Sequence, residues 1–231
     1  LGSYWFSTAL DPIKDLKKNR NCFIYGYKIN GITKEVLKQR APRKSNLDYW
    51  EPSKPIKKYG MDISDRISPI EKEVAYIDFR SELSAYDKYM YFQAFNTTKT
   101  LKSKQDFVRT RSLKLKKAFD EKSIINFYNK EMNKVAITIS QDEIEAVSFI
   151  LGKEYSDIEI LEHRFFKEWG FSVRFKNNDL QYSEAFAGSG ETAVIVLVNR
   201  IQNCIDETLV LLDEPETSLH PGAQTRLIEY I

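Results

Sequence analysis

The sequence predicts an α/β protein that combines antiparallel β hairpins, a helical subdomain and a mostly parallel core sheet. Three features support this prediction. An Asn30-Gly31 pair separates two strand-like runs, apolar residues recur with helical spacing over 100–133, and an apolar run over 208–212 ends in two acidic residues. We expect the 231 residues to divide into an antiparallel β region over 1–98, a helical subdomain over 99–155, and a region with the strongest motifs over 156–231.

The N-terminal region favours short strands separated by turns. Residues 4–7 form an aromatic, strand-like run. Residues 22–29 and 32–39 flank the Asn-Gly pair, which is a strong hairpin signal because both central turn positions need a positive φ. Four prolines and many polar residues predict a long loop over 41–69, and another strand is expected over 74–79.

A basic helix is predicted over 100–133, where Leu101, Val108, Leu115 and Phe119 share one face. Residues 1–122 hold 26 Lys and Arg against 15 Asp and Glu, whereas residues 123–231 hold 9 against 18. The basic half could face a polyanion such as nucleic acid. A solvated lysine surface is the alternative. The candidate nucleic-acid contacts are Lys102, Lys104, Arg109, Arg111, Lys114, Lys116 and Lys117.

The C-terminal half alternates predicted helices and strands. Ser140 is followed three residues later by Glu143, which is the pattern of a capping box, and this helix is expected to end near Gly152. The elements expected next are strands over 158–166 and 171–176, a turn at Asn177-Asn178, a helix over 190–204, a strand over 208–212 and a helix from Pro221.

Composition argues against a membrane protein. The mean hydropathy is −0.46, and no apolar run approaches the roughly 20 residues that span a bilayer. The N-terminus also lacks the pattern of a signal peptide. The two cysteines, Cys22 and Cys204, are far apart and match no metal-binding spacing. We expect a reducing, cytoplasmic location, with a disulfide as the alternative.

The most informative feature is the pair of carboxylates at Asp213 and Glu214. They follow a continuous apolar run over 208–212, which is typical of a strand buried on both faces of a parallel sheet. Carboxylates at such a strand end are costly to bury unless they meet a cation or take part in chemistry. Ligands of open α/β sheets bind at this end of the strands. The pattern predicts a divalent metal or phosphate site, and a surface Asp-Glu pair is the alternative.

The segment LLDEPETSLHP, residues 211–221, resembles the Walker B and D-loop of ABC-class P-loop ATPases, most of all the OLD-type and SMC-like prokaryotic group. The resemblance implies that Asp213 holds Mg²⁺ and that Glu214 polarises the attacking water. It places Ser218, Leu219 and His220 in the D-loop, which crosses to a partner subunit. DNA-repair members have Asp at the position of His220, so here we expect a histidine that packs or hydrogen-bonds at the start of the helix.

A second segment, Ala187-Gly188-Ser189-Gly190-Glu191, is similar to the ABC signature motif. Glycines and a serine at a helix N-terminus leave backbone N–H groups for an anion. The resemblance implies that residues Gly188 to Glu191 contact ATP held by the partner subunit. Gly188 stands where the family has the serine that touches the γ-phosphate. Ser189 or backbone amides would then make this contact.

A complete site also needs the phosphate-binding sequence G-x-x-x-x-G-K-[S/T], which this sequence lacks. We therefore expect an internal segment of an incomplete ABC-type fold, with Walker A and the switch histidine outside it. Alone it should bind ATP weakly and be inactive. Gln93 follows an aromatic run and is a candidate for the family's Q-loop glutamine, with a solvent-exposed glutamine as the alternative.

The resemblance implies a domain that binds and hydrolyses ATP with Mg²⁺, forms a homodimer around the nucleotide, and acts in DNA repair or anti-phage defence. Residues 81–87 are similar to Septu- and retron-associated ATPases, which implies an effector nuclease subunit as a further partner. Two alternatives stay open: an ATP-dependent scaffold or switch with little turnover, and a nucleic-acid-binding module. No membrane partner is expected.

Overall fold

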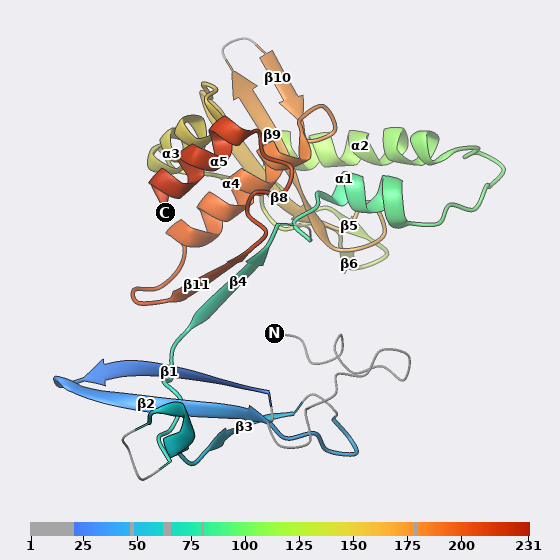
Figure 1. Cartoon of the computed structure of the whole chain (residues 1–231). Helices are drawn as coiled ribbons and strands as arrows, with labels where there is room; N and C mark the ends of the chain where they lie inside the picture. The colour runs from blue at the N-terminus through green and yellow to red at the C-terminus, as the bar shows by residue number, and fades with distance from the viewer. Residues whose placement is uncertain (1–20, 47–48, 62–65, 80, 178–179) are drawn as a thin grey trace. The chain divides into compact units, whose positions relative to one another are not determined.

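The computed structural model describes residues 21–46, 49–61, 66–79, 81–177 and 180–231. The strand expected over 4–7 lies outside these residues. The chain forms two compact units, residues 1–72 and 73–231 (Figure 1). The boundary therefore falls after Lys72 and not at residue 98. The helical region and the motif region belong to one unit.

The first unit contains a three-stranded antiparallel sheet. Asn30 and Gly31 have φ angles of 50° and 79°, and the residues on either side of them pair, which confirms the predicted hairpin. The third strand contradicts the loop predicted over 41–69. It lies at the edge of the sheet, where Pro52 is tolerated because its missing N–H costs no ladder bond. The elements are β1 (Cys22–Ile29), β2 (Ile32–Arg40), β3 (Trp50–Ser53) and the 3-10 turn η1 (Lys57–Tyr59).

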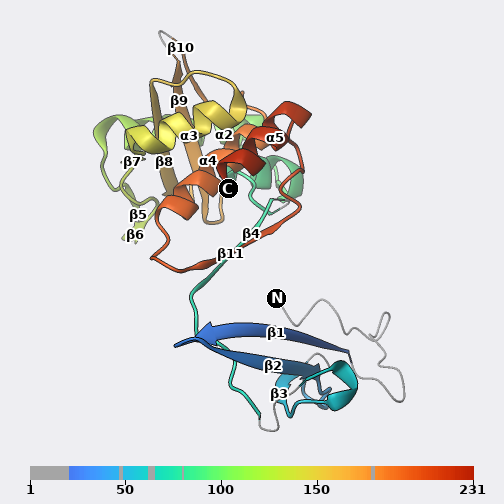
Figure 2. The same cartoon turned by 60° about the vertical axis from the view of Figure 1, so that its left-hand side comes forward.

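The second unit is built on a four-stranded antiparallel sheet in the order β10-β9-β8-β7. Helices cover both faces of this sheet (Figures 1 and 2). The strands are β7 (Ile137–Thr138), β8 (Asp157–His163), β9 (Gly170–Asn177) and β10 (Leu180–Ser183). One face carries α3 (Gln141–Leu151), α4 (Ser189–Gln202) and α5 (Pro221–Tyr230), and the other carries α1 (Ala85–Asp87), the π-helical turn η2 (Lys88–Phe92) and α2 (Lys104–Glu121).

The alternation of side chains along β8 explains this layered arrangement. Ile158 and Ile160 belong to the apolar cluster shared with α3, α4 and α5, whereas Leu161 belongs to the cluster shared with α2. Helix α4 is the most deeply buried helix, because every residue from Gly190 to Val198 is buried. Each fully buried Val, Leu or Ile stabilises the fold by about 1.5–3 kcal/mol.

Local signals placed α3 correctly. The hydroxyl of Ser140 accepts a hydrogen bond from the backbone of Glu143, and the carboxylate of Glu143 accepts one from the backbone of Ser140. Both halves of the capping box are therefore confirmed. Gly152 ends the helix in the left-handed conformation, with φ of 65°.

The helix predicted over 100–133 is wrong in its last third. Helix α2 ends at Glu121, Lys122 follows with φ of 46°, and a small hairpin takes its place. The side chain of Asn133 fixes this turn, because it accepts from the N–H of Ile125 at 2.9 Å and donates to the carbonyl of Ser123 at 2.9 Å. Apolar spacing carries no information on such a contact. The hairpin strands are β5 (Asn126–Phe127) and β6 (Lys130–Glu131).

The mostly parallel core sheet is not confirmed. The largest sheet is antiparallel, and the parallel part within the described residues is a two-stranded pair, β4 (Val74–Asp78) with β11 (Leu209–Asp213). A continuous apolar run shows that a strand gains from burial, but it does not fix how many strands lie beside it.

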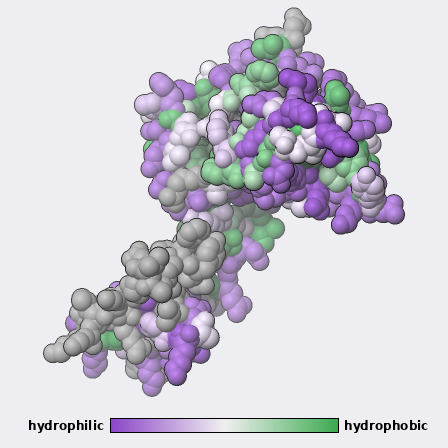
Figure 3. Space-filling model, turned by 90° about the vertical axis from the view of Figure 1, so that its right-hand side faces the viewer, coloured by the Kyte–Doolittle hydropathy of each residue, from purple (hydrophilic) through white to green (hydrophobic). Residues whose placement is uncertain are grey.

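One face of the molecule is drawn with its hydropathy in Figure 3. The face drawn in Figure 3 is largely hydrophilic, and its hydrophobic residues lie in small patches. Among the described helices, none has both the length and the apolar composition required to cross a bilayer.

Candidate functional site

Asp213 lies at the carboxyl end of the parallel strand pair, and Glu214 is the next residue. Asp213 pairs in register with Asp78, the last residue of β4. Tyr76 donates its hydroxyl group to Oδ2 of Asp213. The strand ends therefore place two aspartates next to each other. Sequence reasoning missed Asp78, although an acidic residue at the end of a predicted strand was the available signal.

One face of this strand pair is exposed to solvent. Ile77 points into the core and is 1% exposed. Four apolar or aromatic residues on the opposite face are between 40% and 53% exposed: Val74, Tyr76, Leu209 and Leu211. The prediction that 208–212 is buried on both faces is therefore wrong for this structure. Strand β11 has one neighbouring strand and one covered face among the described residues.

The loop after β11 is fixed by contacts within the chain. Glu214 and Ser218 have φ angles of 50° and 64°, which cost non-glycine residues about 1 kcal/mol each. Gln224 of α5 donates its side-chain amide to the carbonyl oxygens of Glu216 at 3.1 Å and Leu219 at 3.0 Å. These bonds hold the segment that presents the exposed Glu214. No sequence motif pointed to Gln224.

The signature-like segment packs directly against this loop. A Cβ atom placed on Gly190 would lie 2.2 Å from the carbonyl oxygen of Ser218 and 2.9 Å from the side chain of Leu219. Glycine is therefore required at position 190 by close packing. Gly188, the N-cap of α4, has nothing within 4 Å of an added Cβ. Gly188 and Ser189 are both exposed.

Glu191 has a role inside its own chain. Its carboxylate accepts hydrogen bonds from Tyr155 at 2.5 Å, Tyr182 at 2.8 Å and Lys153 at 2.9 Å, and the residue is 7% exposed. Burial acts to raise the pKa of Glu191, but the three hydrogen bonds outweigh it and the pKa lies below its ordinary value. Burial and the contact with Glu191 raise the pKa of Tyr182 to about 12.

The other motif residues have local structural roles. His220 is the N-cap of α5, and its Nδ1 accepts from the N–H of Gly222 at 3.2 Å, which confirms the expected hydrogen-bonding role at the helix start. Leu219 is 8% exposed and belongs to the core. Gln93 ends η2 and is half-buried, with its N–H donating to Tyr89 at 3.3 Å. Lys153, after Gly152, pairs with Glu191 at a helix end.

Most of the candidate nucleic-acid contacts on α2 and the segment before it make contacts within the chain. Arg109, Lys116 and Lys117 pair with acidic residues of the same helix. Lys102 and Lys104 donate to the backbone oxygens of Thr98 and Met90. Arg111 lies against aromatic rings. Within the described part of the chain, Lys114 makes neither an ion pair nor a side-chain hydrogen bond.

Sequence reasoning also missed a buried series of hydrogen-bonded polar side chains that starts from strands β8 and β9. His163 Nδ1 accepts from the N–H of Phe165, so Nε2 carries the proton and donates to Ser172 at 2.8 Å. The Ser172 hydroxyl then donates to Glu184 at 2.5 Å. His163 and Ser172 are 0% exposed and Glu184 is 4% exposed. The serine lies between the histidine and the acid and no substrate can reach it, so the chain of bonds is structural.

Two opposing pKa shifts in this network are expected to cancel over part of the pH range. Burial raises the pKa of Glu184 from 4.5 to about 7, so between these values the folded protein holds a proton that the unfolded chain has lost. Burial lowers the pKa of His163 from 6.5 to about 3. Between these two values the unfolded chain holds a proton on this histidine that the folded protein lacks. Between about pH 4.5 and 6.5 the two effects offset each other.

Replacing His163 with asparagine should reveal the pH dependence of stability that Glu184 causes. The variant is expected to lose stability as pH rises through that window, by up to about 1.4 kcal/mol per pH unit relative to the wild type. Urea unfolding of both proteins at several pH values measures this difference, and other titrating groups cancel in the comparison. If the free energies of unfolding of the two proteins change with pH in parallel, the effect assigned to Glu184 is contradicted.

The described residues contain neither a cluster of metal ligands nor a disulfide. No group of three or more His, Cys, Asp or Glu side chains is arranged to hold a metal ion within the ranges that the structure describes. Cys22 and Cys204 are free cysteines.

Comparison with known proteins identifies no relative: no family model matches the chain, and no match occurs among curated proteins or solved structures.

Proposed function

We propose that this chain is part of an ATP-binding and ATP-hydrolysing domain of the ABC type. The proposal depends on one observation. Asp213 ends a strand that is parallel to its neighbour, and the loop that begins with Glu214 packs through Ser218 onto Gly190 of the signature-like segment. Two segments proposed from the sequence for ABC-type nucleotide sites are thus in direct contact within one chain. In the proposed dimer the strand-end carboxylates would serve the protomer's own ATP, and the signature-like segment would serve the partner's.

The donor atoms at the strand ends suit magnesium. Mg²⁺ takes oxygen ligands and is usually bound by one or two carboxylates together with water and substrate phosphates, so it needs no cage of three protein ligands. Asp213 and Asp78 supply carboxylate oxygens at adjacent strand ends. A bound Mg²⁺ ion would offset the charge of the nucleotide phosphates. Glu214, exposed on the loop, would orient the attacking water and accept its proton.

In this proposal two protomers enclose ATP, and the exposed start of α4 faces the partner's nucleotide. Gly188 and Ser189 are accessible for that contact, and the first N–H groups of a helix have no intrahelical acceptor. The carboxylate of Glu191 is engaged internally and would position this turn of helix instead. Anti-phage defence or DNA repair is the proposed setting, with an effector nuclease subunit as a proposed partner.

A second candidate is an ATP-dependent scaffold or switch. Gly188 gives the helix start no side-chain hydroxyl, and α4 has no side-chain cap. A site with this deficit could hold ATP between protomers without efficient turnover. The two candidates share nucleotide binding and differ in hydrolysis.

The test is ATP hydrolysis by the intact protein that contains this sequence. Wild type is expected to release phosphate from MgATP at least about 100-fold faster than Glu214→Gln, because an amide cannot accept the proton of the attacking water. Glu216→Gln, which changes an exposed residue of the same loop, is the matched control and should turn over at the wild-type rate. If wild type is no faster than Glu214→Gln, the ATPase proposal fails. ATP-dependent dimerisation without turnover would favour the scaffold.

A further inference from the structure

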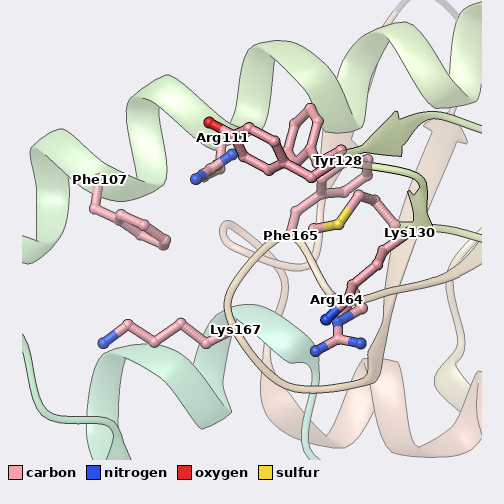
Figure 4. A pocket seen from close by; sticks show the side chains of 9 residues that line it. Phe107, Arg111, Tyr128, Lys130, Arg164, Phe165 and Lys167 are labelled. Carbon is pink, nitrogen blue, oxygen red and sulfur yellow. The ribbon is translucent and has the colours of Figure 1, made fainter.

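A cationic pocket of about 370 Å³ opens between α2, the β5–β6 hairpin and the segment after β8 (Figure 4). Four cationic side chains line it, and no acidic side chain does: Arg111, Lys130, Arg164 and Lys167. None of the four forms an ion pair with a carboxylate in the described ranges of the chain, although Lys167 donates to the carbonyl oxygen of Ala94 at 2.7 Å. Uncompensated charges of one sign around a concave surface attract a ligand of the opposite sign.

The pocket is also aromatic, and its rings are held in place. Phe107 stacks on the buried Tyr89 with ring centroids 4.9 Å apart, and Phe127 packs edge-on against Phe165 at 6.1 Å. The guanidinium carbon of Arg111 lies 5.3 Å from the ring centroid of Phe107 and 5.0 Å from that of Phe127. These contacts preorganise one planar cation and two aromatic faces at the opening.

Tyr128 occupies an unfavourable position at the mouth of the pocket. It is fully exposed, and it adopts φ of 49° before Asn129 at 61°. A turn with two such residues favours Asn-Gly, and a tyrosine there costs about 1 kcal/mol without gaining burial. Local strain of this kind is often retained where a residue serves binding. Figure 4 shows Arg111 between Phe107 and Tyr128, with Lys130, Arg164 and Lys167 farther round the opening.

We propose that this pocket binds an unpaired base of a single-stranded nucleic acid. The base stacks on Tyr128 and the neighbouring aromatic rings, and adjacent phosphates contact Arg111, Lys130, Arg164 and Lys167. Stacking on aromatic side chains together with cations along the backbone is the general mode of single-strand binding. The cations come from three segments, which suits several phosphates of one strand better than a single phosphate group.

This assignment replaces the broader expectation that seven basic residues between Lys102 and Lys117 contact nucleic acid. Of the seven basic residues proposed from the sequence, Arg111 alone lines this pocket. Lys130, Arg164 and Lys167 come from segments that sequence reasoning did not connect with the helix. The proposal is independent of the ATPase proposal, because no residue of the pocket lies in the strand-end site.

Fluorescence anisotropy with a labelled oligothymidylate of about 12 nucleotides, at low salt, tests the proposal on the 231-residue chain. Tyr128→Ala is expected to weaken binding about 10-fold, because one stacked base is lost. Tyr128→Phe keeps the ring and should bind within about twofold of wild type. Phe186→Ala removes another highly exposed aromatic ring away from the pocket and is the matched control. Circular dichroism verifies that each variant is folded.

A second comparison separates the pocket from the exposed face of α2. Lys130→Ala should weaken binding and reduce the slope of log K against log salt by about 0.7, the value for one single-strand phosphate contact. Lys114→Ala, on the helix outside the pocket, should leave both unchanged. If Lys114→Ala weakens binding and Lys130→Ala does not, the pocket assignment is wrong.

Four further results would overturn the proposal. The first is absence of oligothymidylate binding at low salt. The second is equal binding by wild type and Tyr128→Ala. The third is equal competition by polyglutamate, which has charge but no bases. The fourth is displacement of the oligonucleotide by thymidine monophosphate at equal nucleotide concentration, which would assign the pocket to a free nucleotide.

Discussion

Gly190→Ala is expected to destabilise the second unit by about 2–3 kcal/mol, and Gly190→Val should prevent its cooperative folding. Alanine at an early helical position would normally gain up to about 1 kcal/mol over glycine. Here the added Cβ would lie 2.2 Å from the carbonyl oxygen of Ser218, a backbone atom that cannot rotate away. The clash therefore exceeds the helix-propensity gain, because the loop after β11 has to shift.

Urea unfolding followed by circular dichroism measures this effect, and Gly188→Ala is the matched control. Gly188 lies two residues earlier in the same motif and has no neighbour within 4 Å of an added Cβ. Its replacement should change stability by less than about 1 kcal/mol, the scale of an N-cap preference. Equal stability of the two alanine variants would show that Gly190 is not packed against the loop. A Gly190 variant that loses ATP turnover should therefore be tested for stability before its glycine is assigned to nucleotide binding.

Glu191→Ala is expected to cost about 3 kcal/mol, the second large effect. The substitution leaves the Tyr155 hydroxyl buried without its acceptor and removes the partners of Tyr182 and Lys153. Lys153 is about half exposed and rehydrates easily, so most of the loss arises at the tyrosines. Adding Tyr155→Phe to Glu191→Ala should recover part of it, because the orphaned hydroxyl is then absent.

Chemical denaturation of the two single variants and the double variant measures the coupling. Glu229→Ala changes an exposed carboxylate of α5 and should alter stability by less than about 0.5 kcal/mol. Since the folded-state pKa of Glu191 is lowered, its contribution is present above its ordinary pKa and is lost as pH falls through the folded value. A Glu191→Ala variant as stable as wild type, or strictly additive effects, would exclude the network described here.

Local sequence signals predicted the parts of the fold that neighbouring residues decide. The Asn30-Gly31 hairpin and the Ser140–Glu143 capping box involve hydrogen bonds within a few residues, so their patterns are readable in one segment. The predicted end of α2 was wrong because the buried amide of Asn133 fixes the turn after Lys122. Strand β3 was predicted as a loop because an edge strand is defined by its partner strand and tolerates a proline.

The sequence by itself identified Asp213 and Glu214 as residues of the candidate strand-end site. Asp213 and Glu214 follow an apolar run, and that order is covalent. Only the tertiary structure decided their surroundings: Asp78 beside Asp213, Gln224 under the loop, Ser218 against Gly190, and the carboxylate of Glu191 turned inward. The same holds for the cationic pocket, whose walls come from three separate segments. The physical reason is that side-chain packing and hydrogen bonding act over a few ångströms in space, whereas a motif records only distance along the chain.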